Sequence, residues 1–467
     1  MKSRAAFRKS LAAAVLLGAL PGLTHGAMGH TSINVGLFPS DVGSAQAFSA
    51  FGDQASAVLY NPASLTRGAE GELSAGLFYV EPSLEVSSDG GENAPERDGS
   101  VLDDESSEQV LIGMKTDLSK LVKMDHPVYF GFVAAVEDFG EDLMAFESRT
   151  ADEGQFFQYG RQPLFLTLGA GTNVWRGVDA GLAAQITLHS DATMRTNATL
   201  GGETSREQIE VSAEPVLAPI LGVNVALGET FCDTDPCQWG WMDHLDIALV
   251  YRGFSKSKTD VDANAVVPGT VPEPGLPLAI RTIDTFEPEI ISLSGDYHWG
   301  DWRFGAGLEY QIWSRLEDEL GRDDVKEPAS ELEFKDTLVP RLGVEYAFRD
   351  DITLRSGIAW QPTPLNPDED IVRDGDGNAT ADSRSTNEQI NYLDSDRFVL
   401  GLGATMDIAD PPIIAHPIRL DFGYQYHYLR DTDYLLTGVN ENGDRYAEEV
   451  TAGGDAHTVT GSISLKF

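Results

Sequence analysis

The chain ends in a strand pattern that narrows its possible folds. From Ala456 to Phe467, apolar and polar side chains alternate. The apolar set is Val459, Gly461, Ile463, Leu465 and Phe467, and the polar set is Thr458, Thr460, Ser462, Ser464 and Lys466. Successive side chains of a strand point to opposite faces, so one face suits hydrocarbon and the other a polar interior. A closing strand of this kind, with a terminal aromatic residue, is typical of bacterial outer-membrane β-barrels.

The other end of the chain has the pattern of an export signal. Basic residues from Lys2 to Lys9 precede an apolar run at 11–20, which a Pro-Gly break and small residues follow. This is the pattern of a secretory signal peptide. Cleavage is expected after Gly26, with Ala27 as the alternative site. Beyond residue 27 no stretch of about 18 residues is free of charge, so an inner-membrane helical protein is not expected. The sequence predicts a periplasmic or outer-membrane protein.

The charge of the chain excludes nucleic acid as a partner. The 467 residues carry a formal net charge of −41, whereas a nucleic-acid-binding surface needs a basic footprint. We interpret the carboxylates as solvated loop groups that keep the protein soluble, with divalent-ion bridging to lipopolysaccharide as the alternative. The mean hydropathy of −0.20 suits a barrel that alternates lipid-facing and lumen-facing residues.

Motifs for catalysis and metal binding are missing from the sequence. Cys232 and Cys237 form an even pair that predicts one local disulfide in an oxidising compartment. The acidic run that begins at Asp374 fails as an EF-hand, because its sixth position is Ala379 and its twelfth is Ser385. No phosphate-binding loop, Gly-x-Ser-x-Gly elbow or His-Glu-x-x-His motif occurs. We therefore expect no cofactor, no metal and no enzyme activity.

Alternation of the kind seen at the C-terminus recurs along the chain. Phe398, Leu400 and Leu402, for example, are separated by single residues. By this rule we predict fourteen strands, at 71–86, 107–117, 126–138, 162–175, 177–191, 214–227, 243–254, 288–299, 302–313, 338–349, 351–360, 395–407, 418–431 and 456–467. The even number is the one that closure requires in bacterial barrels.

The links between these strands alternate in length. Long links are predicted at 87–106, 139–161, 192–213, 255–287, 314–337, 361–394 and 432–455, and short ones at 118–125, 176, 300–301, 350 and 408–417, with 228–242 the longest of the short class. Outer-membrane barrels have short periplasmic turns and long outer loops, so the disulfide should face the periplasm. Aromatic residues near strand ends predict interfacial girdles, with ordinary packing as the alternative: Tyr251, Trp299, Trp302, Trp313, Trp360 and Tyr428.

The segment before the first strand, at 27–70, does not alternate and is rich in small residues between Gly43 and Leu65. Such a segment can pack with short helical turns inside a barrel of this size and plug it. Its aromatic residues Phe38, Phe48 and Phe51 either line an apolar pocket or serve only in packing. A plugged barrel is not an open diffusion pore.

Several blocks carry a resemblance to a known family. They are the run from Gly43 through Asn61-Pro62-Ala63, Tyr129-Phe130-Gly131-Phe132 leading to Asp138-Phe139-Gly140, Gln311-Ile312-Trp313-Ser314, the strand from Arg355 to Trp360 with Pro362 and Pro364, and the stretch from Leu393 to Phe398 followed by Gly401-Leu402-Gly403. Together they resemble the FadL family of outer-membrane long-chain fatty-acid and hydrocarbon transporters, over nearly the whole mature chain.

The resemblance implies an all-β fold: a fourteen-stranded antiparallel transmembrane barrel at 71–467, with the segment at 27–70 as a hatch in its lumen and 1–26 as the signal peptide. It implies capture of a hydrophobic substrate at the cell surface and lateral release at a kink in the third strand, where Asp138, Phe139 and Gly140 lie. Gly permits such a bend. The alternative for these residues is an ordinary turn at the outer end of the strand.

The predicted loop 255–287 is unusually apolar for an outer loop. We interpret its apolar side chains as a surface capture groove, with self-packing as the alternative: Val266, Val267, Val271, Leu276, Leu278, Ile280, Ile283 and Phe286. In the family that the chain resembles, the loops after strands five and seven form the first, weaker capture site. This loop takes the second of those positions.

Charged residues on the side of each predicted strand that faces the lumen are candidates for substrate binding. A desolvated fatty-acid carboxylate needs a cationic partner, and Arg303, Arg341 and Arg355 could provide it. The alternative is that these arginines pair with lumen carboxylates such as Glu345. Glu309 and His427 are also expected to face the lumen.

The sequence as a whole predicts a monomeric transporter in the outer membrane of a Gram-negative bacterium, in contact with outer-membrane lipid and lipopolysaccharide. Its expected partners are hydrophobic small molecules, long-chain fatty acids first, with aromatic or aliphatic hydrocarbons as the alternative. An outer-membrane lipase and a structural or adhesive barrel are the other hypotheses.

Overall fold

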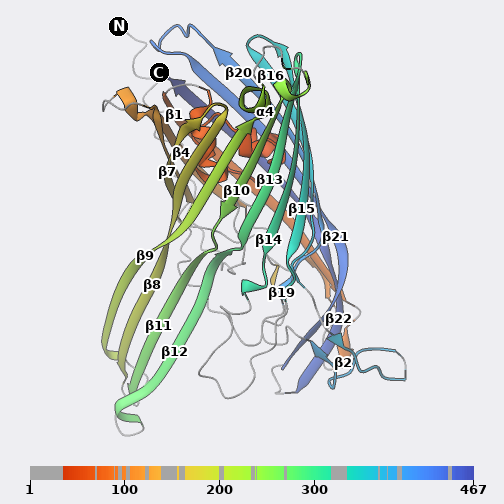
Figure 1. Cartoon of the computed structure of the whole chain (residues 1–467). Coiled ribbons are helices and arrows are strands. Elements are labelled where there is room, and N and C mark those ends of the chain that lie inside the picture. Colours follow the sequence, from red (N-terminus) through yellow and green to blue (C-terminus); the bar gives the residue numbers. More distant parts are fainter. Residues whose placement is uncertain are drawn as a thin grey trace, which may run out of the picture.

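A closed antiparallel β-barrel forms the body of the molecule in the computed structural model (Figure 1). The structure describes residues 35–68, 71–88, 90–92, 97–100, 106–120, 126–137, 155–156, 164–198, 204–232, 237, 239–267, 271–316, 334–365, 369–375, 377–385, 392–439 and 444–467. Within these residues no helix is both long enough and apolar enough to cross a membrane.

Fourteen strands make the wall, as the sequence predicts. They are β1 (Gly71–Ser88), β4 (Ser107–Asp117), β5 (Val128–Glu137), β7 (Leu164–Trp175), β8 (Val178–Ala198), β9 (Thr204–Ala226), β10 (Leu245–Arg252), β13 (Glu289–Trp299), β14 (Trp302–Ile312), β15 (Thr337–Arg349), β16 (Ile352–Gln361), β20 (Arg397–Ile408), β21 (Ile418–Val439) and β22 (Arg445–Lys466). Each pairs with the next, and β22 pairs with β1 to close the barrel.

The predicted alternation of faces is confirmed. Outward residues such as Leu77, Leu182 and Phe422 expose 67%, 64% and 63% of their surface, as lipid-facing side chains of a barrel should. On the closing strand Thr458 and Ser464 turn inward and are fully buried. The apolar stripe read from the sequence is therefore the outer surface of the wall.

Three of the predicted outer loops are wrong, because strands run through them. The range 192–213 is largely β8 and β9, 432–455 is largely β21 and β22, and 255–287 forms the hairpin of β11 (Ser255–Val267) and β12 (Val271–Glu287). Alternation detects a strand only when one of its faces is apolar. The segments of β8, β9 and β11 beyond the membrane have few apolar residues, so hydropathy does not mark them. β12 has apolar residues, but the prolines at 272, 274 and 277 argue against a strand in its sequence.

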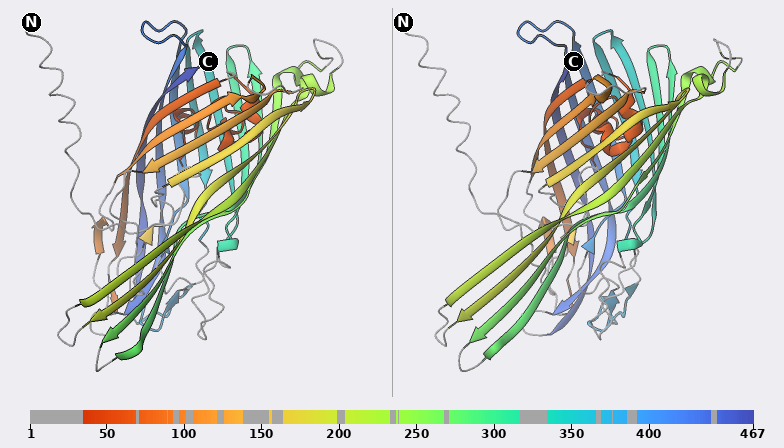
Figure 2. Two further views of the ribbon diagram at one scale, coloured as in Figure 1. Left: turned by 90° about the vertical axis from the view of Figure 1, so that its left-hand side faces the viewer. Right: turned by 60° about the vertical axis from the view of Figure 1, so that its left-hand side comes forward.

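The outer ends of β8, β9, β11 and β12 form an arm that leaves the barrel at the end opposite the C-terminus (Figures 1 and 2). β8 keeps β9 as its antiparallel neighbour out to Ala198, and its other edge pairs in parallel with β11 from His189 to Asn197. The hairpins after the fifth and seventh barrel strands are thereby joined into one sheet.

Short elements complete the described chain. They are β2 (Gly91–Glu92), β3 (Arg97–Ser100), η3 (Leu118–Lys120), β6 (Gln155–Phe156), α4 (Leu227–Phe231), η4 (Met242–His244), β17 (Glu369–Asp370), β18 (Arg384–Ser385) and β19 (Tyr392–Leu393). α4 and η4 lie at the barrel end that carries the C-terminus, where short turns join β13 to β14 and β15 to β16. Short turns identify this end as periplasmic.

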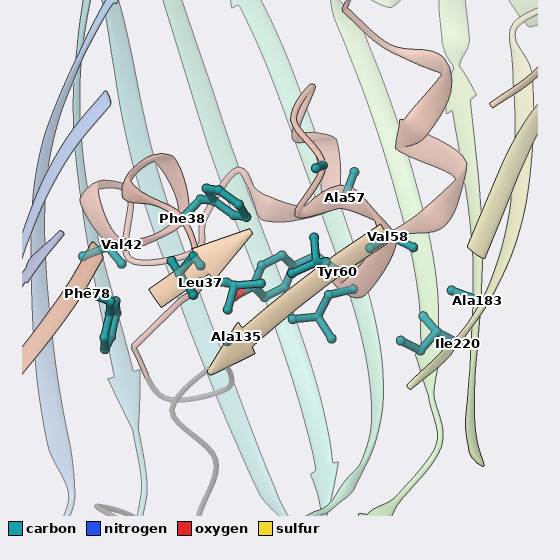
Figure 3. Packing of buried hydrophobic residues seen from close by; sticks show 14 of the residues in the cluster. Leu37, Phe38, Val42, Ala57, Val58, Tyr60, Phe78, Ala135, Ala183 and Ile220 are labelled. Atoms are coloured by element: carbon teal, nitrogen blue, oxygen red, sulfur yellow. The ribbon is translucent and has the colours of Figure 1, made fainter. Parts of the chain in front are cut away.

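Residues 35–68 lie inside the barrel near its periplasmic end, and we call them the lumen segment (Figure 2). The segment contains α2 (Pro39–Gly43), η1 (Ser49–Phe51), α3 (Ala57–Tyr60) and η2 (Pro62–Thr66). Many of its apolar residues, from Val35 to Leu65, form a buried cluster with wall residues such as Phe78, Ala135 and Ile220 (Figure 3). Small residues let these short helices pack against the wall.

Candidate functional site

Two rows of wall glycines receive the lumen segment. The first row contains Gly305, Gly343, Gly357 and Gly401, which are direct cross-strand partners on β14, β15, β16 and β20. A Cβ atom built on Gly357 would lie 1.8 Å from the carbonyl oxygen of Ser44. The backbone of the segment therefore lies directly on the backbone of the wall.

The second row lies on the other side of the lumen. Gly171, Gly181 and Gly222 are consecutive cross-strand partners on β7, β8 and β9. A Cβ on either Gly171 or Gly181 would lie 2.2 Å from backbone atoms of Pro62, and one on Gly222 would lie 2.0 Å from the side-chain oxygen of Asn61. A side chain at any of these positions would displace the segment.

Asn61 connects the segment to the wall at the second row. Its Nδ2 donates to the Asn224 side chain of β9 at 2.6 Å and to the carbonyl of Ala50 at 2.8 Å. Its Oδ1 accepts the N–H of Ala63 at 3.1 Å and so caps η2. Of the predicted hatch residues, Asn61, Pro62 and Ala63 thus form the contact with the second glycine row.

The predicted hatch aromatics are all buried. Phe38 packs into the apolar cluster of the segment, with its ring 3.0 Å from where a Cβ of Gly113 would lie. Phe48 lies under the guanidinium of Arg303, 4.7 Å from ring centroid to Cζ, and Phe51 faces Arg67 in the same manner at 5.2 Å. These are packing and cation–π contacts. A role for the three rings in lining a substrate pocket stays a prediction.

Arg303 and Arg341 bind the lumen segment from the wall. Arg341 Nη1 donates to the carbonyl of Ala45 at 3.1 Å, and its Nη2 lies 3.2 Å from Glu309. Arg303 Nη2 donates to the carbonyl of Phe51 at 3.4 Å and to Asp296 at 2.7 Å, while Nε and Nη1 donate to the wall carboxylates of Asp296 and Glu345. Both arginines thus connect the charged lining of the wall to backbone carbonyls of the segment.

The candidate carboxylate-binding arginines already face carboxylates. Arg303 lies 2.7 Å from Asp296 and 2.8 Å from Glu345, and Arg355 lies 3.5 Å from Glu345 and 3.7 Å from Asp421. Pairing with Glu345, the alternative left open by the sequence, is therefore found for both. Substrate binding by these arginines stays a prediction, and it would require a fatty-acid carboxylate to compete with a wall carboxylate.

One turn of the segment is strained. Ala45 and Gln46 have φ angles of 47° and 64°, in the left-handed region that side chains other than glycine seldom adopt. The carbonyl of Ala45 is the one that Arg341 holds, and Gln46 N–H donates to the carbonyl of Asp41 at 2.8 Å. Wall and segment together keep this turn in place.

Asp41 organises the turn from inside the segment. Its carboxylate accepts the Ser49 hydroxyl at 2.6 Å and the Phe38 N–H at 3.1 Å. Burial outweighs these hydrogen bonds, and raises the pKa of Asp41 to about 6. The seated segment therefore holds a carboxyl group that changes charge close to neutral pH.

Three further polar contacts hold the periplasmic side of the segment. Arg419 of β21 lies 2.9 Å from Asp53, Lys115 of β4 donates to the carbonyl of Asp53 at 2.9 Å, and Arg67 lies 2.7 Å from Asp246 of β10. Gln54 adds a 2.7 Å hydrogen bond to Asp421. The contacts come from widely separated parts of the wall, so the segment is held from several directions.

Some predicted features lie where the sequence did not place them. Trp313 is 2% exposed and packs against Phe286, 6.1 Å between ring centroids, so its assignment to a girdle is wrong. β14 ends at Ile312, and Trp313 is the residue at which the chain leaves the strand. Phe286 is fully buried rather than at a surface groove. Trp299, Trp302, Trp360 and Tyr428 are exposed, as girdle residues should be, and Tyr251 is half-buried.

The structure leaves two predicted sites untested. Asp138, Phe139 and Gly140 lie outside the described residues, which end β5 at Glu137. The other residues of the predicted capture groove belong to strands β11 and β12. Their side chains lie outside the described part of the structure. Cys232 and Cys237 form a disulfide.

The glycine rows, and the contacts that Asp296 and Asn224 make, were not predicted from the sequence. A signal for the rows was present, because glycines stand at lumen-facing positions of consecutive predicted strands. These glycines can be recognised as rows only once the strand register is known, because cross-strand pairing decides which of them are neighbours.

No family model matches the chain. Alkane uptake protein A of Marinobacter nauticus is 42% identical over 463 residues, which are 98% of this chain and 96% of that protein. The long-chain fatty acid transport protein of Salmonella typhi is 23% identical over 264 residues, 50% of this chain and 56% of that protein.

Two solved structures share the fold. A FadL homologue of Pseudomonas aeruginosa superposes with a TM-score of 0.55 at 16% identity, covering 92% of this chain and 98% of its own. The toluene transporter TodX of P. putida superposes with a TM-score of 0.51 at 12% identity, covering 93% and 99%.

The barrel, its seated lumen segment and the near full-length relative define the class of the protein. It is a Gram-negative outer-membrane β-barrel. The chain belongs to the FadL family of outer-membrane transporters for hydrophobic molecules.

Proposed function

We propose that this protein imports long-chain aliphatic molecules across the outer membrane, with alkanes as the first substrate class. The observation that carries the proposal is the relative named for alkane uptake, which matches 98% of the chain at 42% identity. The lumen supports it, because the arginines that could bind a carboxylate already face wall carboxylates. An alkane needs no such partner.

Long-chain fatty acids are the second candidate. They are the substrate named for the Salmonella typhi relative, and they share the long hydrocarbon chain. A fatty acid would need one lumen cation to exchange its carboxylate partner for the substrate. Arg355 is the favoured cation for that exchange, since its two contacts, at 3.5 and 3.7 Å, are longer than the 2.7 and 2.8 Å contacts of Arg303.

In this proposal the lumen segment is the hatch. It lies across the periplasmic half of the lumen, on two glycine rows and under wall cations. Transport requires it to leave part of this seat. We propose that the segment begins to leave the wall at the strained turn of Ala45 and Gln46. Breaking the hydrogen bond from Arg341 to the Ala45 carbonyl would let these two residues leave their unfavourable positive φ angles.

The arm is the proposed surface capture site. Parallel pairing of β8 with β11 joins the hairpins after the fifth and seventh barrel strands, and places them in one sheet beyond the membrane. The predicted groove residues from Val266 to Ile283 lie on β11 and β12 of this sheet. Substrate would pass from there into the lumen and leave through the wall near Asp138 to Gly140.

The protein is proposed to act as a monomer surrounded by outer-membrane lipid and lipopolysaccharide, and we assign it no catalytic role. A lipase is disfavoured by the absence of a nucleophile motif in the sequence, and its relatives are named for uptake and transport. A structural or adhesive barrel would leave the seated segment and its polar contacts without a purpose.

Uptake measurements test the proposal. Cells that lack the protein receive radiolabelled hexadecane, palmitate or toluene, with and without the restored chain. We expect restoration to increase hexadecane uptake most. Rescue of palmitate alone would replace the alkane assignment by the fatty-acid one, and rescue of toluene alone would favour aromatic hydrocarbons. Rescue of none, with the barrel folded in the outer membrane, would contradict import.

A further inference from the structure

The link between β9 and β10 exposes large aromatic side chains. Phe231 exposes 64% of its surface, Trp239 62% and Trp241 48%. Trp175, at the neighbouring end of β7, exposes 61%. Such rings lose about 150–250 Å² of accessible surface when they are buried, so several exposed in one short link are unfavourable in water. Concentrated exposure of this kind indicates a contact surface.

Several contacts fasten the described residues of this link. The disulfide between Cys232 and Cys237 closes it, and the Asp243 carboxylate accepts the N–H of Cys237 at 2.8 Å. Thr230 donates its hydroxyl to the carbonyl of Arg176 at 3.2 Å, and Arg176 donates in return to the carbonyl of Cys232. The aromatic residues are therefore presented by a segment that is fastened to itself and to the next turn.

The position of the link points to the occupant. β9 carries outward residues on the lipid-facing wall, with Leu217 63%, Leu221 52% and Val223 39% exposed. It ends at Ala226, and α4 begins at the following residue. Figure 2 shows α4 extending outward from the wall at the periplasmic end of the barrel. The aromatic residues thus continue a surface that contacts hydrocarbon, at the level where the membrane ends.

We propose that residues 227–232 and 239–244 are an aromatic foot that lies in the headgroup region of the inner leaflet of the outer membrane. Tryptophan prefers this region, because its ring is apolar and its N–H can reach a polar partner. The foot binds phospholipid at the glycerol and headgroup level, and acts as an anchor for the depth and tilt of the barrel on the side of β9 and β10. The disulfide keeps the rings at that level.

A single-site fluorescent label tests the foot. The only natural cysteines are bonded to each other, so Trp239→Cys provides one free thiol for an environment-sensitive dye. The full-length protein is placed in phospholipid nanodiscs that contain nitroxide groups either on the headgroup or deep on the acyl chain. The matched control is Asp350→Cys, on the exposed turn between β15 and β16 at the same end of the barrel.

We expect the label at residue 239 to lose most of its fluorescence with headgroup nitroxide and to resist aqueous iodide, whereas the label at residue 350 responds in the opposite way. Replacing both Cys232 and Cys237 by Ser should reduce lipid quenching at residue 239 while the barrel stays folded. Iodide quenching equal to that of the control would overturn the proposal. Protection from iodide in whole envelopes but not in nanodiscs would also overturn it, in favour of a periplasmic protein partner.

Discussion

Replacing Gly357 by alanine tests whether the first glycine row is the seat of the lumen segment. The new Cβ would lie 1.8 Å from the Ser44 carbonyl oxygen, whereas ordinary contacts begin at 3.4 Å. Both groups belong to backbone, so no flexible side chain can yield. The segment and the wall must separate locally by about 1.6 Å to accept one methyl group.

Overpacking of this kind costs about 1–3 kcal/mol. If the cost falls on the seated state, the unseated fraction rises by a factor of about 5 to about 150, since each 1.4 kcal/mol is tenfold in an equilibrium constant. A barrel with an unseated segment should conduct ions. The assay is single-channel recording in planar bilayers, where Gly357→Ala should show more frequent openings than the parent protein.

The control is Gly461→Ala, on the outward face of β22, where the nearest atom to the new Cβ is 3.8 Å away. Heat-modifiable electrophoretic migration verifies that both variants form barrels. Equal conductance of the two variants would show that the methyl group at Gly357 is absorbed without displacing the segment, and that the first glycine row is not its seat.

Three further predictions concern release of the segment and exit of the substrate. Arg341→Met removes the hydrogen bond to Ala45, worth about 1.5–3 kcal/mol for a charged donor, and should raise channel openings at least tenfold relative to Arg349→Met at the exposed periplasmic turn; equal openings would contradict it. The pKa of Asp41 is raised to about 6, so the seated state binds the proton more tightly than the released state, and seating weakens as pH rises through 6. Openings should increase between pH 5 and pH 7.5, and Asp41→Asn should remove this increase; a pH dependence that survives the substitution would exclude Asp41 as its cause. Gly140→Val should slow hydrocarbon uptake without changing barrel formation or surface binding, and unchanged uptake would remove the proposed lateral opening from this position.

The strands within the membrane could be predicted from the sequence because hydrocarbon imposes a strict rule on them. Leu400 and Leu402 face lipid with single residues between them, and the pattern therefore marks β20 directly. Outside the membrane the rule lapses. β11 runs from Ser255 to Val267, and nothing in its hydropathy separates it from a loop.

The candidate site could be predicted only in part, because it depends on register. Sequence placed Arg303, Glu345 and Arg355 on lumen faces, but their ion pairs follow from cross-strand pairing of β14 with β15 and of β15 with β16. The glycine rows likewise follow from cross-strand pairing. Burial of Trp313 could not be anticipated, since it depends on where the chain turns after β14.

Locking the segment to the wall tests the central claim, that a movable lumen segment gates import. Ala55→Cys with Gly113→Cys puts two thiols in contact, because a Cβ on Gly113 would lie 2.8 Å from that of Ala55, and a disulfide needs only about 1 Å more between these atoms. Hexadecane uptake is measured with this bond formed and after its reduction, and the single variants receive the same reductant. We expect the closed bond to stop uptake and its reduction to restore it. Full uptake with the bond closed would contradict gating by the lumen segment.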